Sequence, residues 1–263
     1  MLIDGRYAPV SIANWKLIPS VADRLLASRV SRPLEFEARR RLTVVIPYRD
    51  RAAHLEQLLP VLNATLQAQR IEHRVLVVEQ ANEQPFNRGR LLNIGVHHAA
   101  DSSDYFCLHD VDAIPVNANY LCPSQPLRLV NWIHTEKGRC RRENHYFSGA
   151  VSIRKEQIHA ANGFSNEYWG WGKEDDDFFF RLLLAGFLCY FDLTGEFRDL
   201  PNPAGKSTRK SIWESRRRTQ LNRRRRSRLV RGLDDPALEG LSSAQYEIVS
   251  RSNGSYEKLA VTW

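Results

Sequence analysis

The chain has 263 residues, of which 43% are hydrophobic, and this length is enough for a substantial core in one α/β unit. Its formal net charge is +8, and the excess arginine lies late in the chain, in a stretch with few apolar or aromatic residues to stack bases, which argues against specific nucleic-acid recognition. No apolar run is long enough for a transmembrane helix. The four cysteines have no close metal-ligand spacing and are expected to be reduced thiols, two of them in the core.

Strand and helix signals alternate from residue 42 onward, as expected for a mainly parallel, Rossmann-like α/β sheet flanked by helices. In chain order we expect a strand at 42–46, a helix at 52–69, a strand at 75–79, a helix at 90–99 and a strand at 105–108. Later helices are expected at 155–161 and from the acidic residues 174–177 onward. The whole chain, 1–263, is interpreted as a single domain, with 1–40 as an entry segment and 205–263 as a basic C-terminal segment packed on it or extending from it.

Two kinds of carboxylate cluster stand out. Asp110 and Asp112 follow the apolar strand at 105–108, and residues two apart in an extended backbone share a face. They would lie at the C-terminal end of a strand, where open α/β sheets bind ligands, and could hold a divalent cation against diphosphate oxygens. The alternative is an Asp-x-Asp that occurs by chance in a turn.

The second cluster, at 174–177, follows aromatic side chains. Trp169 and Trp171 offer apolar faces and indole N–H donors of the kind that sugar rings contact. The four carboxylates supply acceptors for hydroxyl groups and a general base. The alternative is a solvated first turn of a helix, because the helix dipole favours acidic residues there.

Three further motifs suit phosphate or sugar recognition. A hydrophobic strand delivers Arg49 and Arg51 to its C-terminal end, where arginine suits a phosphate. Phe86 and Arg88 open the helix at 90–99, and a Tyr-Phe-Ser-Gly stretch begins at Tyr146. Residues 132–144 are polar, basic and aperiodic, so we expect a moving loop there.

Together these motifs resemble the β-1,4-galactosyltransferase family, glycosyltransferase family 7. The family pattern runs Pro-Phe/Tyr-Arg-x-Arg, Phe-Asn-Arg-x-x-Leu-x-Asn-x-Gly, His-Asp-Val-Asp, Tyr-x-Gly-Gly and Trp-Gly-Trp-Gly-x-Glu-Asp-Asp. The same order appears here at 47–51, 86–95, 109–112, 146–149 and 169–176, with Ser148 replacing the first glycine of the fourth motif. The spacing and the tail most resemble the branch that galactosylates xylose in the proteoglycan linkage.

The resemblance implies an inverting, metal-dependent transferase of the GT-A type. Such an enzyme moves galactose from UDP-galactose to a hydroxyl of an acceptor sugar of the xylose, glucose or N-acetylglucosamine type, in a β-1,4 linkage. It implies that Asp175 is the base and that Tyr146 favours galactose over its N-acetylated analogue. The donor site implied is Pro47, Tyr48, Arg49, Arg51, Phe86, Arg88, Asp110, Val111, Tyr146 and Trp171, and the acceptor site is Trp171, Glu174, Asp175 and Asp176.

The metal site departs from the family pattern. The resemblance gives Asp112 as one ligand, but the family completes the site with Met-x-x-His or His-x-His, and the last histidine here is His159. Alignment puts Glu196 and Asp199 at those positions. Oxygen donors suit Mn²⁺, or alternatively Mg²⁺, so both carboxylates are expected to ligate. The alternative is that they are loop charges and the site is incomplete.

Other function classes stay open at this point. One is a polysaccharide-forming transferase with a UDP-N-acetylhexosamine donor, and another is a basic, non-catalytic binding protein of the same fold. The arginines at 216–218, 223–226 and 228 could touch an anionic membrane or an acidic glycan, or could form one solvated helix face. Eukaryotic members of the family are anchored Golgi enzymes, but the amino terminus here lacks a signal-peptide pattern. We therefore expect a cytoplasmic protein of bacterial origin; the alternative is a fragment freed of its anchor.

Overall fold

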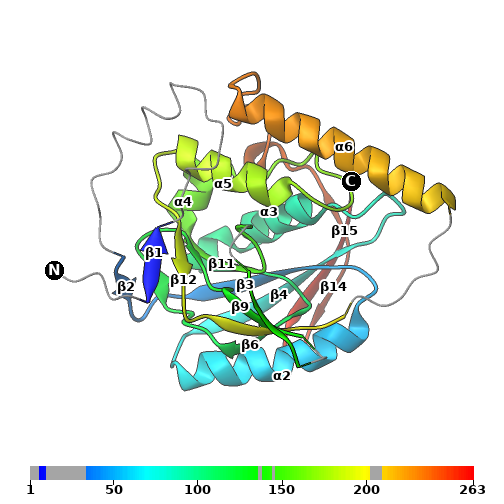
Figure 1. Cartoon of the computed structure of the whole chain (residues 1–263). Coiled ribbons are helices and arrows are strands. Elements are labelled where there is room, and N and C mark those ends of the chain that lie inside the picture. Colours follow the sequence, from blue (N-terminus) through cyan, green and yellow to red (C-terminus); the bar gives the residue numbers. More distant parts are fainter. Residues whose placement is uncertain (1–5, 10–33, 136–137, 144–145, 202–208) are drawn as a thin grey trace.

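The structure is a computed structural model that describes residues 6–9, 34–135, 138–143, 146–201 and 209–263. Its helices are α2 (Ala52–Ala68), α3 (Arg88–Ala99), α4 (Lys155–Ala160), α5 (Glu174–Leu184) and α6 (Arg209–Val230), with short 3-10 turns at Ala100–Ser102 and Leu241–Ser243. Figure 1 shows α2 on one side of the central sheet and α3, α4 and α5 on the other, with α6 beyond α5.

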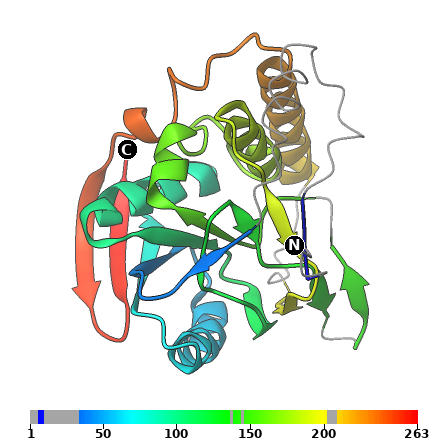
Figure 2. The same cartoon turned by 90° about the vertical axis from the view of Figure 1, so that its left-hand side faces the viewer.

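The central sheet has nine strands in the order β1-β12-β8-β11-β5-β3-β4-β15-β14. Their bounds are β1 (Tyr7–Pro9), β3 (Leu42–Tyr48), β4 (His73–Gln80), β5 (Tyr105–His109), β8 (Leu127–Arg128), β11 (Ala150–Arg154), β12 (Tyr190–Asp192), β14 (Glu247–Asn253) and β15 (Glu257–Thr262). The strands β5, β3, β4 and β15 are parallel neighbours. Figure 2 shows this sheet between α2 and the opposite helices.

The expectation of a mainly parallel sheet holds for these four strands and for the pair β12 and β8, but not for the rest of the sheet. Strand β11 runs antiparallel to both β5 and β8, and both edge strands, β1 and β14, are also antiparallel to their neighbours. The parallel strands are continuous apolar runs because both of their faces are covered, and every residue of β3 is buried. The predicted strands and helices from 42 to 108 are all present, with boundaries shifted by one or two residues.

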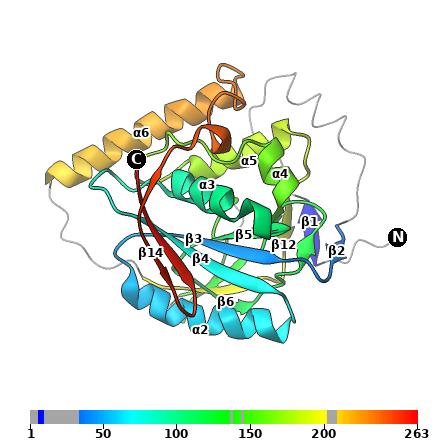
Figure 3. The same ribbon diagram turned by 180° about the vertical axis from the view of Figure 1, so that it is seen from behind.

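The C-terminal segment does more than pack on the domain. Its last two strands complete the central sheet, because β15 pairs with β4 in parallel and β14 pairs with β15. Figure 3 shows β14 and β4 close together at this edge, although the two segments are far apart in sequence. The basic interval before them is the long helix α6.

A second sheet, in the order β10-β9-β13-β6, lies beside α2. Its strands are β6 (Ala113–Asn117), β9 (Trp132–His134), β10 (Cys140–Arg142) and β13 (Glu196–Asp199), and a small pair joins β2 (Phe36–Glu37) to β7 (Cys122–Pro123). Strands β9 and β10 are antiparallel, so part of the expected loop at 132–144 is a hairpin. Positions 136–137 and 144 lie outside the described residues, as does most of the entry segment.

Helix α3 approaches the sheet closely. Gly95 makes this possible, since a Cβ there would lie 2.3 Å from Cγ1 of Val45 and 3.1 Å from Cγ2 of Val78. Asn87 caps the helix, because its side chain accepts a hydrogen bond from the backbone N–H of Arg90. Among the described helices, none combines the length and apolar character needed to cross a bilayer.

Candidate active site

The candidate site lies where neighbouring parallel strands end. Strand β3 ends at Tyr48 and leads to Arg49, and β5 ends at His109 and leads to Asp110. Because these strands are parallel neighbours, their carboxyl ends meet at one edge of the sheet, the usual ligand-binding edge of α/β folds.

A cavity of about 730 Å³ opens at this edge. Its lining consists of Pro47, Arg49, Asp50, Arg51, Phe86, Arg88, Asp110, Val111, Asp112, Tyr146, Ser148, Gly170, Trp171, Gly172, Lys173, Glu174, Asp175, Thr219 and Arg223. Most of the residues expected at the donor and acceptor sites therefore line one cavity. The exceptions are Tyr48 and Asp176, which are buried outside its lining.

One part of the cavity combines arginine with an aromatic ring. The Arg49 guanidinium carbon is 5.4 Å from the centre of the Phe86 ring, and Arg49 donates a hydrogen bond of 2.7 Å to the carbonyl of Gln84. Arg49 is thus held beside an aromatic surface. Such a pair suits a planar base next to a phosphate.

Arg88 joins the two carboxylate clusters. Its Nε lies 2.6 Å from Asp110 and its Nη1 lies 3.9 Å from Glu174. Within the part of the chain that the structure describes, Arg88 Nη1 and Glu174 Oε2 are buried without a hydrogen-bond partner. A buried polar atom without a partner is costly, so these two atoms are candidates for contact with a bound substrate.

The carboxylates at the start of α5 are buried, and their pKa values follow from that. Burial, and then the neighbouring Asp175, raise the pKa of Glu174 to about 7. Burial, and then the neighbouring Asp176, raise the pKa of Asp175. Lys173 precedes the helix with a left-handed φ of 81° and lies 2.7 Å from Asp176. A carboxylate whose pKa is raised accepts a proton more readily near neutral pH, as a general base requires.

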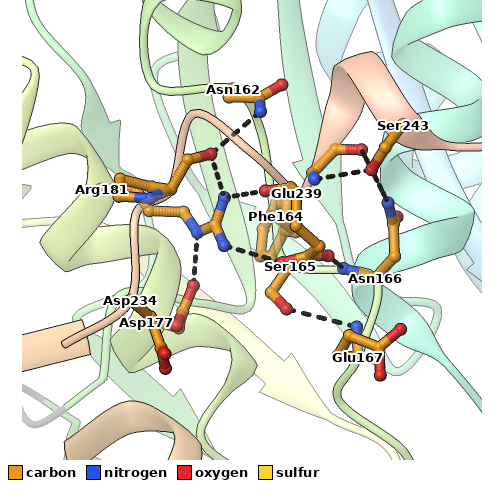
Figure 4. Close-up of polar contacts among 12 residues, drawn as sticks. Asn162, Phe164, Ser165, Asn166, Glu167, Asp177, Arg181, Asp234, Glu239 and Ser243 are labelled. Carbon is orange, nitrogen blue, oxygen red and sulfur yellow. Dashed lines mark hydrogen bonds and ion pairs between the residues drawn. The ribbon is translucent and has the colours of Figure 1, made fainter. Parts of the chain in front are cut away.

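Deeper in the structure, α5 is held by a polar network. Arg181 lies 2.6 Å from Asp177 and 3.0 Å from Glu239, and the hydroxyl of Tyr168 donates a 2.9 Å hydrogen bond to Asp177. Figure 4 shows Arg181 between Asp177 and Glu239. Asn166 lies on the other side of Glu239, and its side-chain amide donates a 2.6 Å hydrogen bond to the carbonyl of Gly240. The fourth carboxylate of the acidic run is therefore structural: it anchors the helix that presents Glu174 and Asp175.

The predicted metal ligands are only partly brought together. Burial, and then the nearby charges of Asp110 and Asp199, raise the pKa of Asp112 to about 6. Asp199 pairs across the sheet with Ala113, the residue after Asp112, which explains this proximity. The Glu196 carboxylate is instead 2.9 Å from Nε2 of His134. Among the described residues, no three acidic, histidine or cysteine side chains converge into a complete metal centre.

Sequence reasoning gave no site role to seven residues of the cavity lining. Five of them belong to recognised motifs, namely Asp50, Ser148, Gly170, Gly172 and Lys173. Thr219 and Arg223 come from α6, and they lie four residues apart on the same face of that helix. Only the packing of α6 against the rest of the site brings them there.

Comparison with known proteins identifies the relatives of this chain. A family model described as the N-terminal region of glycosyl transferase group 7 matches residues 12–123, and one described as the N-terminal domain of galactosyltransferase matches residues 134–194. β-1,4-Galactosyltransferase 3 of Bos taurus is 32% identical over 94% of this chain and 62% of its own length. Human β-1,4-galactosyltransferase 4 is 36% identical over 83% of this chain and 62% of its own length.

A solved structure of a galactosyltransferase is also similar to this chain. A crystal structure of a variant of Drosophila β-1,4-galactosyltransferase 7, in complex with manganese, UDP-Gal and xylobiose, has a TM-score of 0.67 to this chain at 26% identity. The match covers 84% of this chain and 93% of that one. The GT-A type of fold expected from the sequence is thereby confirmed.

The same relatives correct one expectation. They are animal galactosyltransferases, whereas the sequence had suggested a cytoplasmic protein of bacterial origin; that assignment is wrong. The chain spans 62% of the length of the bovine relative. The family assignment itself is confirmed: with five motifs in order, two matching family models and a shared fold, the chain belongs to the β-1,4-galactosyltransferase family, glycosyltransferase family 7.

Proposed function

We propose that this chain transfers galactose from UDP-galactose to a hydroxyl group of an acceptor sugar, with inversion and formation of a β-1,4 linkage. The observation that carries the proposal is that a single cavity joins Asp112, at the end of β5, to Asp175, at the start of α5. A metal-binding carboxylate and a base carboxylate that line one cavity are what such a transfer requires. The solved relative that binds UDP-Gal and xylobiose supports the substrate class.

In this proposal Asp175 removes the proton from the acceptor hydroxyl. The oxygen then attacks the anomeric carbon of galactose from the face opposite the diphosphate, and the bond to the UDP oxygen breaks. Trp171, which is 75% exposed, offers its indole face to the acceptor sugar. Glu174 accepts hydrogen bonds from acceptor hydroxyl groups, and Asp176 supports Asp175 from behind the cavity.

The donor lies along the arginine side of the same cavity. Phe86 and Arg49 contact the uridine, while Arg51 and Arg88 neutralise part of the diphosphate charge; the rest of the proposed donor set, Pro47, Tyr48, Asp110 and Val111, surrounds them. Tyr146 stands beside the galactose. The alternative donor, a UDP-N-acetylhexosamine, would have to place its acetamido group against this ring.

The residues at the metal position fit a divalent cation. Crowded carboxylates with raised pKa values need a positive charge, and their oxygens suit Mn²⁺ or Mg²⁺. Asp112 and Asp199 would hold the ion, with diphosphate oxygens and water completing its coordination. When bound, the ion stabilises negative charge on the departing diphosphate. Glu196 remains a predicted third ligand, and it would have to leave His134 to take part.

The test is transfer by the purified chain with Mn²⁺ and UDP-galactose, using glycosides of xylose, glucose and N-acetylglucosamine as acceptors. The product's anomeric configuration, read by NMR, should be β. Asp175→Asn should keep its fold and its affinity for UDP but lose transfer by about a hundredfold or more. Asp101→Asn is the control, since that side chain is exposed and lies outside the cavity lining. Near-normal turnover in Asp175→Asn would move the base elsewhere.

Donor choice is tested by comparing UDP-galactose with UDP-N-acetylgalactosamine. The wild-type chain should transfer faster from UDP-galactose than from UDP-N-acetylgalactosamine. Tyr146→Ala should reduce the ratio of these two transfer rates. A wild-type preference for the N-acetylated donor would favour the alternative function.

We also infer a peripheral contact through the arginines of α6 with an acidic glycan or an anionic membrane. Arg225 and Arg228 are paired with Glu167 and Asp234, so these two are not available for it. Exposed arginines at 216, 217 and 224 remain. Retention on heparin and on phosphatidylglycerol vesicles, each measured at low and high salt, distinguishes the two partners. A variant with glutamine at positions 216, 217 and 224 should lose both interactions.

A further inference from the structure

Helix α6 forms hydrogen bonds with the loop that carries Trp171, the exposed tryptophan of the active site. The amide Nδ2 of Asn222 donates to the carbonyl of Trp169 at 3.3 Å and to the carbonyl of Gly172 at 2.9 Å. The Asn222 side chain is buried, although most of its neighbours on α6 are exposed arginines. One amide therefore holds both ends of the Trp169–Gly172 loop.

Two arginines on the same face of α6, Arg218 and Arg226, lie beside this loop and the start of α5. Residues at 218, 222 and 226 are spaced four apart and so lie along one face of the helix. A Cβ on Gly170 would lie 3.2 Å from Nε of Arg218, and Nε of Arg226 lies 3.8 Å from Asp176. These two side chains thus lie beside the loop and the first turn of α5, and Figure 1 shows α6 running next to α5.

The loop needs an external support. Gly170 and Gly172 have φ values of 72° and 100°, and Lys173 has a φ of 81°. Glycine tolerates the left-handed region, but lysine does so poorly because its Cβ approaches the following carbonyl. The hydrogen bond from Asn222 fixes the carbonyl immediately before Lys173. Asp175 follows two residues later, and Trp171 stands between the two bonded carbonyls.

We propose that Asn222 is a positioning residue, which fixes Trp171 over the acceptor side of the cavity and sets the start of α5, and so the place of Asp175. The inference rests on the proposed function for its consequence in catalysis. Gly170, between the two carbonyls, donates a 2.8 Å hydrogen bond to the carbonyl of Phe86 on the donor side, and this bond does not involve Asn222. The effect of Asn222 therefore falls on the acceptor and on turnover more than on binding of UDP.

The experiment compares Asn222→Ala and Asn222→Leu with the wild type. Leucine keeps the number and branching of the side-chain heavy atoms but has no donor, so it separates the hydrogen bonds from the packing. Gln220→Ala is the matched control, because Gln220 is an exposed amide on the same helix. In both Asn222 variants the backbone amides of residues 168–175 should exchange with solvent about tenfold faster or more, and in the control they should not.

Kinetics with UDP-galactose supply the second measurement. The acceptor KM should rise about tenfold in both Asn222 variants, kcat should fall, and the Kd of UDP should stay within about twofold of the wild-type value. Unchanged exchange and unchanged acceptor KM in a folded Asn222→Leu would overturn the proposal, as would an equal loss of UDP affinity. If the wild-type chain transfers no galactose to any acceptor, the proposed function fails, and the exchange measurement still decides whether Asn222 holds the loop.

Discussion

Glu174 should make the protein less stable as the pH rises. Burial and the neighbouring Asp175 raise the pKa of Glu174 from 4.5 to about 7 in the folded state. The folded protein therefore binds this proton more tightly than the unfolded chain does. The stabilising contribution is complete below about pH 4.5 and is lost as the pH rises through about 7, where the buried carboxyl must ionise.

The magnitude follows from that pKa. A rise from 4.5 to about 7 corresponds to at most about 3 kcal/mol of stability lost over this range, because one pKa unit is about 1.4 kcal/mol. Attraction to Arg88, 3.9 Å away, already offsets part of the burial. The Glu174 side chain is 12% exposed, so solvent screening is limited. We expect Glu174→Gln to remove this penalty while keeping the shape of the side chain.

The assay is urea unfolding of the wild type and Glu174→Gln at about pH 5 and about pH 8.5. The free energies of unfolding should be similar at the lower pH, and the variant should be more stable by about 1–3 kcal/mol at the higher pH. Glu83→Gln is the control, because Glu83 is exposed and its substitution should have little effect at either pH. An equal difference between wild type and Glu174→Gln at both pH values would refute the reasoning.

Three further predictions concern the core and the metal. Arg88→Met should reduce the free energy of unfolding by about 3–5 kcal/mol at neutral pH, because it leaves buried carboxylates unpaired. Gly95→Ala should reduce it by about 1–3 kcal/mol, since its Cβ would overlap the sheet, whereas Gly254→Ala has no neighbour within 4 Å and should be neutral by the same denaturation assay. Chelation with EDTA should abolish transfer and added Mn²⁺ should restore it; Asp112→Asn should raise the Mn²⁺ concentration for half-maximal activity at least about tenfold. No such rise in Glu196→Gln would remove that residue from the metal site.

The sequence predicted β3, β4 and β5 because these buried parallel strands are continuous apolar runs between turn signals. It did not predict β15, which pairs in parallel with β4. It did not predict β14, all of whose residues are exposed, so neither an apolar run nor a buried face marks it. The β9–β10 hairpin was missed for a similar reason: two of the three β10 residues are arginines, and β9 pairs on its other side with β13, which lies far along the chain.

The residues of the candidate site also fall into two groups, those that the sequence predicted and those that only the structure revealed. Residues within local motifs, such as Arg88 and Asp175, were found because their chemistry is visible in a few consecutive positions. The partner of Glu196 could not be found, because its contact with His134 depends on the parallel pairing of β9 with β13. Asn222 was hidden inside an arginine-rich run, and only its two bonds to the tryptophan loop distinguish it from the exposed residues around it.

The buried carboxylates explain why so much of the chain serves to hold this cavity. Glu174, Asp175 and Asp112 all have raised pKa values, so each costs stability when ionised in the absence of a cation or substrate. Such groups would relax toward solvent unless the elements that carry them were fixed independently. The Arg181 network fixes α5 from behind, and Asn222 fixes the loop before it. The long helix α6 and the segment after it that carries Glu239 thus form the support that lets an unfavourable cluster of charge persist where the chemistry needs it.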